Sequence, residues 1–238
     1  MIPGRKFQKD GIESEISIYT GEVVLEGTLG FPKETGAIVL FAHGSGSSRH
    51  SPRNRYVAQV LQSQGIGTLL FDLLTRGEES IDEFSGELRF DIPFLANRLT
   101  DATRWLRQRP DLEGVKLGYF GASTGAAAAL VAAAKLQDAI GAVVSRGGRP
   151  DLAGDALNSV RAPTLLIVGG DDEPVIGMNR QALAKLRCLD KKLVIVPGAT
   201  HLFEEPGTLE EVARLAAEWF KKYLTTAGKR TVHASARK

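Results

Sequence analysis

The sequence predicts an α/β protein with a mostly parallel central sheet of about eight strands and helices on both of its faces. Two observations lead to this fold class. Short apolar runs of strand length recur along the chain, and a segment with helical spacing follows most of them. Strands that alternate with helices build parallel sheets, because each helix returns the chain to the same end of the sheet.

The predicted strands are of two kinds. Residues 16–19 and 23–29 alternate between apolar and polar positions, which predicts an antiparallel pair at a sheet edge. The other strands are continuously apolar, as strands covered on both faces are. These strands are expected at residues 37–42, 68–71, 115–120, 140–144, 164–168 and 193–196.

Helical spacing occurs between the predicted strands. The expected helices cover residues 56–61, 94–107, 126–136, 152–157, 179–189 and 209–223. Residues 75–89 are of mixed charge and are expected to form a loop. Since no repeat or linker interrupts the series, residues 1–227 are predicted to form a single domain. Residues 228–238 are polar, basic and aperiodic, which predicts a flexible tail.

Composition argues against several classes of function. Hydrophobic residues make up 43% of the chain and charged residues 24%, which is typical of a globular protein. The net charge of +2 argues against a nucleic-acid partner, and no apolar run is long enough to predict a membrane span. The single cysteine, Cys188, is expected in a helix as a packed residue and not as a reactive thiol. One cysteine and an N-terminus without an apolar core together predict a cytoplasmic location.

The candidate nucleophile follows one of the buried strands. Ligands of parallel α/β sheets bind beyond the carboxyl ends of the strands, so the residues after each strand are candidates for chemistry. The strand at 115–120 runs into Gly121-Ala122-Ser123-Thr124-Gly125 and then a helix. This G-x-S-x-G turn exposes a serine hydroxyl at the sheet edge, and its glycines avoid clashes at a strained backbone. Ser123 is therefore the candidate nucleophile, although a serine here is also typical of a helix N-cap.

A serine nucleophile needs a base, and a carboxylate commonly orients that base. Of the four histidines, His201 follows the last predicted strand, where the base falls in the chain order serine, acid, histidine. The acid should then follow the preceding strand. Asp172 is preferred because two glycines before the acidic cluster allow a tight bend there. Asp171 and Glu173 remain alternatives.

Two backbone N–H groups are expected to stabilise a negative oxygen during the reaction. One belongs to Thr124, at the start of the helix after Ser123. The other is assigned to Ser45 in the loop His43-Gly44-Ser45-Gly46, where glycines let N–H groups point into a concavity. His43 is expected to stabilise this loop and not to act as a base. A phosphate-binding loop is the rival interpretation, and the absence of the third glycine of the dinucleotide motif argues against it.

Taken together, these motifs show that the chain resembles α/β-hydrolases over residues 16–223, and it is similar to their dienelactone hydrolase-like branch. The resemblance rests on His43–Gly46, Gly121–Gly125, Asp172 and His201. It implies the α/β-hydrolase fold. No cap domain is expected, because only residues 145–158 separate the strand at 140–144 from the next one. The dienelactone hydrolases proper use a cysteine nucleophile, whereas Ser123 stands here, which favours ordinary carboxylic esters as substrates.

The implied activity is that of a serine hydrolase, which cleaves small carboxylic esters through an acyl-enzyme intermediate. A thioesterase, lactonase or acyltransferase would use the same residues. A binding protein that has kept the fold without the chemistry is an alternative of another class. No cofactor and no metal are expected, the expected partner is a small-molecule ester, and a homo-oligomer is left open.

Three side chains near the predicted site are expected to contact the substrate. Arg76 and Arg146 lie at predicted carboxyl ends of strands, where a guanidinium would attract a carboxylate. Phe203, two residues after the candidate base, is expected to form part of an acyl or alcohol wall. The alternative for the arginines of these loops is ion pairing with nearby carboxylates, which are Glu78, Glu79 and Asp151.

Overall fold

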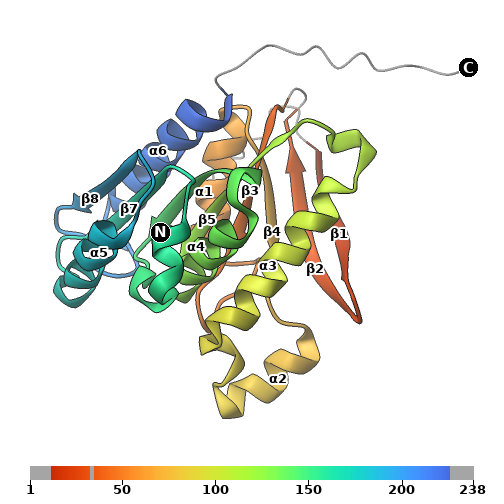
Figure 1. Ribbon diagram of the computed structural model, residues 1–238, viewed down its shortest axis with the longest axis horizontal. Helices are drawn as coiled ribbons and strands as arrows, with labels where there is room; N and C mark the ends of the chain where they lie inside the picture. Colours follow the sequence, from red (N-terminus) through yellow and green to blue (C-terminus); the bar gives the residue numbers. More distant parts are fainter. Residues whose placement is uncertain (1–11, 33–34, 226–238) are drawn as a thin grey trace, which may run out of the picture.

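The centre of the molecule is an eight-stranded sheet, seen in a computed structural model that describes residues 12–32 and 35–225 (Figure 1). The predicted tail at 228–238 lies outside the described residues. The strands are β1 (Ile12–Thr20), β2 (Val23–Phe31), β3 (Ala37–Ala42), β4 (Gly67–Phe71), β5 (Lys116–Ala122), β6 (Ile140–Arg146), β7 (Thr164–Gly169) and β8 (Lys191–Val196). Their order across the sheet is β1-β2-β4-β3-β5-β6-β7-β8. β1 pairs antiparallel with β2, and β2 with β4, while every other neighbouring pair is parallel. The predicted α/β fold with a mostly parallel sheet is confirmed.

Helices cover both faces of this sheet. They are α1 (Pro52–Ser63), α2 (Arg76–Ser85), α3 (Ile92–Arg107), α4 (Thr124–Leu136), α5 (Glu173–Lys185) and α6 (Thr208–Phe220). α1 and α6 pack together over one face, and α3, α4 and α5 cover the other (Figure 1). Each face therefore has its own apolar core. The strands between the cores must be apolar on both sides, which explains why β3 is buried at every position.

Small side chains let α4 lie close to the centre of the sheet. Ala126, Ala127, Ala128 and Ala129 are all fully buried at the start of this helix. An alanine-rich face lets helix and sheet backbones approach closely, because no long side chain holds them apart. The turn that joins β5 to α4 is consequently held at the carboxyl edge of the sheet, between the ends of β3 and β6.

The connection after β4 contains a helix where a loop was predicted. Residues 75–89 contain α2, which begins with a capping box: the Thr75 hydroxyl accepts a hydrogen bond from the Glu78 N–H, and the Glu78 carboxylate accepts one from the Thr75 N–H. Gly86, with φ of 69°, ends it. Periodicity did not reveal the helix because its apolar residues, Ile81 and Phe84, are exposed, by 67% and 93%. Figure 1 shows α2 projecting from the body of the molecule.

Other differences from the predicted boundaries are local. α5 begins at Glu173 instead of residue 179 and ends at Lys185, so Cys188 lies beyond the helix in which it was expected. Cys188 is nevertheless buried, as predicted.

β6 and β7 are joined by a 3₁₀ segment, η4 (Pro150–Ser159), and by no inserted domain, in agreement with the uncapped fold. In the two described stretches, no helix has the length and apolar character needed to cross a bilayer.

Candidate active site

Ser123 occupies a strained turn between β5 and α4. Its backbone has φ of 51° and ψ of −123°, a region that residues other than glycine rarely adopt. The flanking glycines are needed for steric reasons. A Cβ atom on Gly121 would collide with Cα of Ala126, and one on Gly125 would collide with the carbonyl oxygen of Ala42. The Ser123 side chain makes no capping hydrogen bond to α4, which argues against the N-cap interpretation of this serine.

Hydrogen bonds to β6, to α4 and to the loop after β6 hold the strained turn in place. The Ser123 N–H donates to the carbonyl oxygen of Arg146 at 3.3 Å, and the Ser123 carbonyl oxygen accepts from Ala126 N at 3.1 Å and from Arg149 N at 3.0 Å. Backbone strain persists only where the surrounding structure over-determines it, and it is concentrated at functional sites. The geometry therefore presents the Ser123 hydroxyl at the carboxyl edge of the sheet.

His201 and Asp172 form a hydrogen-bonded pair at the same edge. Nδ1 of His201 lies 2.7 Å from Oδ2 of Asp172. The Asp172 side chain is 12% exposed and the His201 side chain 38%. The loops after β7 and β8 press together here, since a Cβ atom on Gly169 would collide with the carbonyl oxygen of Ala199. Of the three neighbouring carboxylates, Asp172 is therefore the one that orients the histidine, while Asp171 and Glu173 are exposed.

The candidate base lies close to the serine turn. A Cβ atom on Gly147 would be 3.7 Å from Cε1 of His201, and the residue before Gly147 accepts the Ser123 N–H bond. Within the described residues, no hydrogen bond joins the Ser123 hydroxyl to His201, and Nε2 of His201 has no partner. Nε2 of His201 and the Ser123 hydroxyl thus lie at the same edge of the sheet, with no hydrogen bond between them among the described residues.

The loop after β3 is held by His43, as predicted. Nε2 of the imidazole accepts the Leu73 N–H at 3.0 Å, so the ring hydrogen is on Nδ1, which donates to the Gly44 carbonyl oxygen at 3.0 Å. Burial lowers the pKa of His43, against the opposing effect of the Gly44 carbonyl. His43 is therefore a neutral residue that ties two loops together.

This loop lies directly against the nucleophile turn. A Cβ atom on Gly44 would be 3.0 Å from Cβ of Ser123, so only glycine allows this approach without a shift. The Ser45 N–H, predicted as an oxyanion donor, is engaged: it donates to Oγ1 of Thr124 at 3.0 Å. The Thr124 side chain is thus part of the site, whereas the sequence pattern pointed only to the Thr124 backbone N–H.

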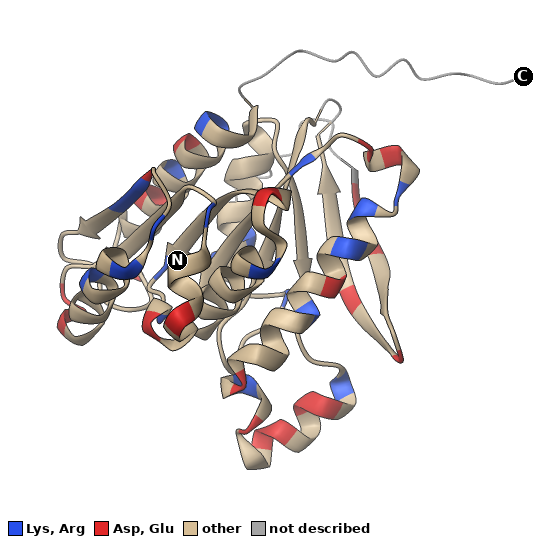
Figure 2. Cartoon of the chain, in the orientation of Figure 1, with Lys and Arg blue, Asp and Glu red and all other residues tan. Residues whose placement is uncertain are grey.

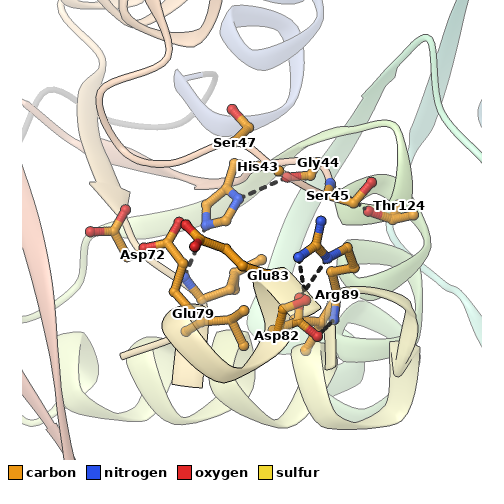
Figure 3. Close-up of a pocket in the computed structure, with 14 residues that line it drawn as sticks. His43, Gly44, Ser45, Ser47, Asp72, Glu79, Asp82, Glu83, Arg89 and Thr124 are labelled. Atoms are coloured by element: carbon orange, nitrogen blue, oxygen red, sulfur yellow. Dashed lines mark hydrogen bonds and ion pairs between the residues drawn. The ribbon is translucent and has the colours of Figure 1, made fainter. Parts of the chain in front are cut away.

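A pocket of about 130 Å³ opens beside Ser45 and Thr124 (Figure 3). Residues 43–47 form one side of it and α2 another, and four carboxylates line it, which are Asp72, Glu79, Asp82 and Glu83. Asp72 is paired with Arg49, and Asp82 with Arg89. Glu79 and Glu83 are exposed and have no ion pair among the described residues. The acidic character of α2 (Figure 2) was not recognised from the sequence, where a loop was predicted; the spacing of Thr75 and Glu78 is the signal that could have revealed this helix.

The predicted substrate contacts are not supported by the structure. Arg76 is 85% exposed and pairs with Glu26 at 3.1 Å, away from the pocket lining. Arg146 is only 7% exposed, and its Nη2 donates to the Asn54 side-chain oxygen at 3.4 Å.

Burial, aided by the nearby positive charge of Arg53, lowers the pKa of Arg146 to about 10. Phe203 is 1% exposed and packs in the core beneath α6. Both side chains are buried and neither lines the pocket, so the structure does not show a substrate wall at Phe203 or a carboxylate contact at Arg146. Arg149 pairs with Asp151 at 2.8 Å, which is the alternative expected for the arginines of these loops.

The family follows from comparison with known proteins. A sequence profile of the dienelactone hydrolase family matches residues 25–228. The chain belongs to the dienelactone hydrolase family. A dienelactone hydrolase from Anabaena variabilis is 61% identical in sequence, and the two structures superimpose with a TM-score of 0.89 over 91% of this chain and 100% of that one. This family member therefore has the α/β-hydrolase fold. A lidless serine hydrolase from Xanthomonas campestris has the same fold at 21% identity, with a TM-score of 0.72 over 91% of this chain and 97% of that one.

Curated relatives of this dienelactone hydrolase family member are longer than the chain itself. A Mycobacterium tuberculosis protein whose name describes it as a candidate phosphoribosyl transferase is 56% identical over 218 residues. The match covers 91% of this chain and 48% of that protein. The chain thus spans about half the length of these curated relatives.

Proposed function

We propose that this protein is a serine esterase that cleaves small carboxylic esters through an acyl-enzyme intermediate. The observation that carries the proposal is the 2.7 Å hydrogen bond between Asp172 and His201 beside the turn of Ser123. A carboxylate bound to Nδ1 leaves Nε2 of the imidazole free to accept a proton, which is the orientation that a general base needs.

The reaction then proceeds in two acyl-transfer steps. Nε2 of His201 accepts the Ser123 proton while Oγ attacks the ester carbonyl, and the Thr124 N–H stabilises the oxyanion. His201 returns the proton to the leaving alcohol, and a water that His201 activates then releases the acid. The lack of a direct Ser123–His201 bond in the described residues is compatible with this sequence, because catalytic hydrogen bonds often tighten only when substrate is bound.

The pocket beside the site favours uncharged or cationic substrate groups. Its free carboxylates, Glu79 and Glu83, would repel an anionic group placed there. The same repulsion would act on a pyrophosphate group, so we propose ester hydrolysis and not phosphoribosyl transfer for this chain. A panel of esters, thioesters and lactones with neutral, cationic and anionic alcohols would define the leaving group.

Covalent labelling provides the direct test. The wild-type protein should hydrolyse p-nitrophenyl acetate and form a fluorophosphonate adduct at Ser123, identified by mass spectrometry. Ser123→Ala should lose both reactions while its circular dichroism and melting temperature stay close to the wild type, because the hydroxyl makes no capping bond to α4. A Ser123→Ala variant with full activity would contradict the proposal, and a wild-type protein that forms no adduct would favour a non-catalytic binding protein.

A further inference from the structure

The hydrogen bond from Ser45 to Thr124 changes the assignment of the second oxyanion donor. A backbone N–H carries one hydrogen, and that of Ser45 is directed at Oγ1 of Thr124 at 3.0 Å. The two residues are 79 positions apart in the sequence and meet because the loop after β3 packs on the first turn of α4. Figure 3 shows them side by side on one wall of the pocket.

The Thr124 hydroxyl retains a hydrogen that can be donated. A threonine hydroxyl has one donor and two acceptor lone pairs, and the Ser45 N–H uses one of the lone pairs. In the part of the chain that the structure describes, Thr124 Oγ1 has no acceptor for its own hydrogen. The residue is only 4% exposed and is one of the residues that line the pocket, so a molecule bound there can accept this hydrogen.

We propose that the Thr124 hydroxyl is itself an oxyanion donor, and that the Ser45 N–H acts through it as a positioning group. The inference rests on the proposed esterase function. Thr124 follows the nucleophile directly, so its N–H and its side-chain hydroxyl can converge on the same substrate oxygen. No proton is transferred to or from Thr124 in this arrangement: it donates a hydrogen bond throughout.

Two physical effects favour the hydroxyl as a donor. Accepting the Ser45 N–H polarises the O–H bond, since chains of hydrogen bonds strengthen one another. The same bond also fixes the hydroxyl oxygen, so little reorganisation is needed when negative charge develops on the substrate. A loop fastened by His43 and pressed against Ser123 at Gly44 keeps the Ser45 N–H in position.

The test compares variants that keep or remove the hydroxyl. Thr124→Val preserves the branched shape and should lower kcat on p-nitrophenyl acetate by about 10²-fold with little change in KM, because one oxyanion donor is lost. Thr124→Ser keeps the hydroxyl and should retain most of the activity. Thr100→Val is the matched control, since Thr100 is equally buried, at 3% exposure, and its hydroxyl bonds only to the Ala96 carbonyl of its own helix.

A structural readout separates this role from simple packing. In a phosphonate adduct of Ser123, the phosphoryl oxygen should accept a hydrogen bond from Thr124 Oγ1, and the Ser45 amide should stay bonded to Thr124. The NMR chemical shift of the Ser45 amide proton should therefore change little on adduct formation, both in the wild type and in Thr124→Ser.

Distinct results would overturn the inference. If Thr124→Val matches or exceeds an active wild type, or if the phosphoryl oxygen takes the Ser45 N–H while Thr124 rotates away, the hydroxyl is not a donor and the esterase proposal stands. If the wild type neither hydrolyses esters nor forms the adduct, the esterase function fails and this inference fails with it.

Discussion

Two histidines at the carboxyl edge of the sheet illustrate how position decides chemistry. His43 is 9% exposed, and both of its ring nitrogens bond to backbone groups. The His201 side chain is 38% exposed, with one nitrogen bonded to a carboxylate and the other unengaged among the described residues. The His43 ring can therefore neither accept nor release a proton without losing one of these hydrogen bonds. The second ring has a nitrogen available and a negative charge to stabilise its protonated form.

The largest expected effect on activity comes from removing the Asp172 carboxylate, which is hydrogen-bonded to His201. Asp172→Asn would keep the shape of the site but lose the charge and favour the wrong tautomer, so ester hydrolysis should fall by about 10⁴-fold. Asp171→Asn is the matched control, because its side chain is exposed and has no bond to His201. Steady-state kinetics on both variants would decide the matter. Equal losses, or a larger loss at Asp171, would mean that the 2.7 Å pair does not serve the reaction.

For His43, the expected loss is one of stability and not of chemistry. His43→Ala would leave the Leu73 N–H and the Gly44 carbonyl without their partner and would open a cavity. The free energy of unfolding should therefore fall by about 2–4 kcal/mol. Urea denaturation would measure this change. The exposed His50 provides the control, since His50→Ala should be close to neutral. A His43→Ala protein of unchanged stability but without activity would place His43 in the reaction.

The smallest effect is a difference in pH dependence. Burial lowers the pKa of His43 in the folded state, while the unfolded chain keeps a value near 6.5. Below that pH the unfolded state binds a proton that the folded state does not accept. The contribution of neutral His43 to the free energy of unfolding is therefore present above about pH 6.5. It is lost as the pH decreases, by at most about 2 kcal/mol between pH 6.5 and pH 5. The melting temperature of His43→Asn should therefore decrease less between pH 6.5 and pH 5 than that of the wild type. Equal decreases in the two proteins would contradict this assignment.

The regular features of the fold could be predicted because they depend on short stretches of sequence. Buried strands must be apolar along their whole length, and the glycines around Ser123 mark a sharp turn because they stand between a predicted strand and a predicted helix. The helix α2 could not be found in this way, since Phe84 is exposed and the one buried residue of that helix is the charged Asp82. Its capping box was the local signal, and hydrophobic periodicity does not register such a signal.

Substrate contacts were harder to predict than the turn. Arg146 ends β6 and Phe203 lies in the loop after β8, but whether such a residue faces a pocket or the core depends on what packs above it. α1 supplies the side chain that contacts Arg146, through Asn54, and the core beneath α6 encloses Phe203. The sequence around Arg146 and around Phe203 contains no pattern that predicts which helix packs on each of them.

The sequence by itself determined the sheet, the Ser123 turn and the order in which the candidate residues occur, because these follow from local sterics and from burial. Only the tertiary structure decided between Asp172 and its two acidic neighbours. Their positions in the chain are nearly equivalent, and the packing of the loops after β7 and β8 brings just one of them to His201. The structure likewise decided that the Ser45 N–H meets the Thr124 hydroxyl, since that contact joins segments 79 residues apart.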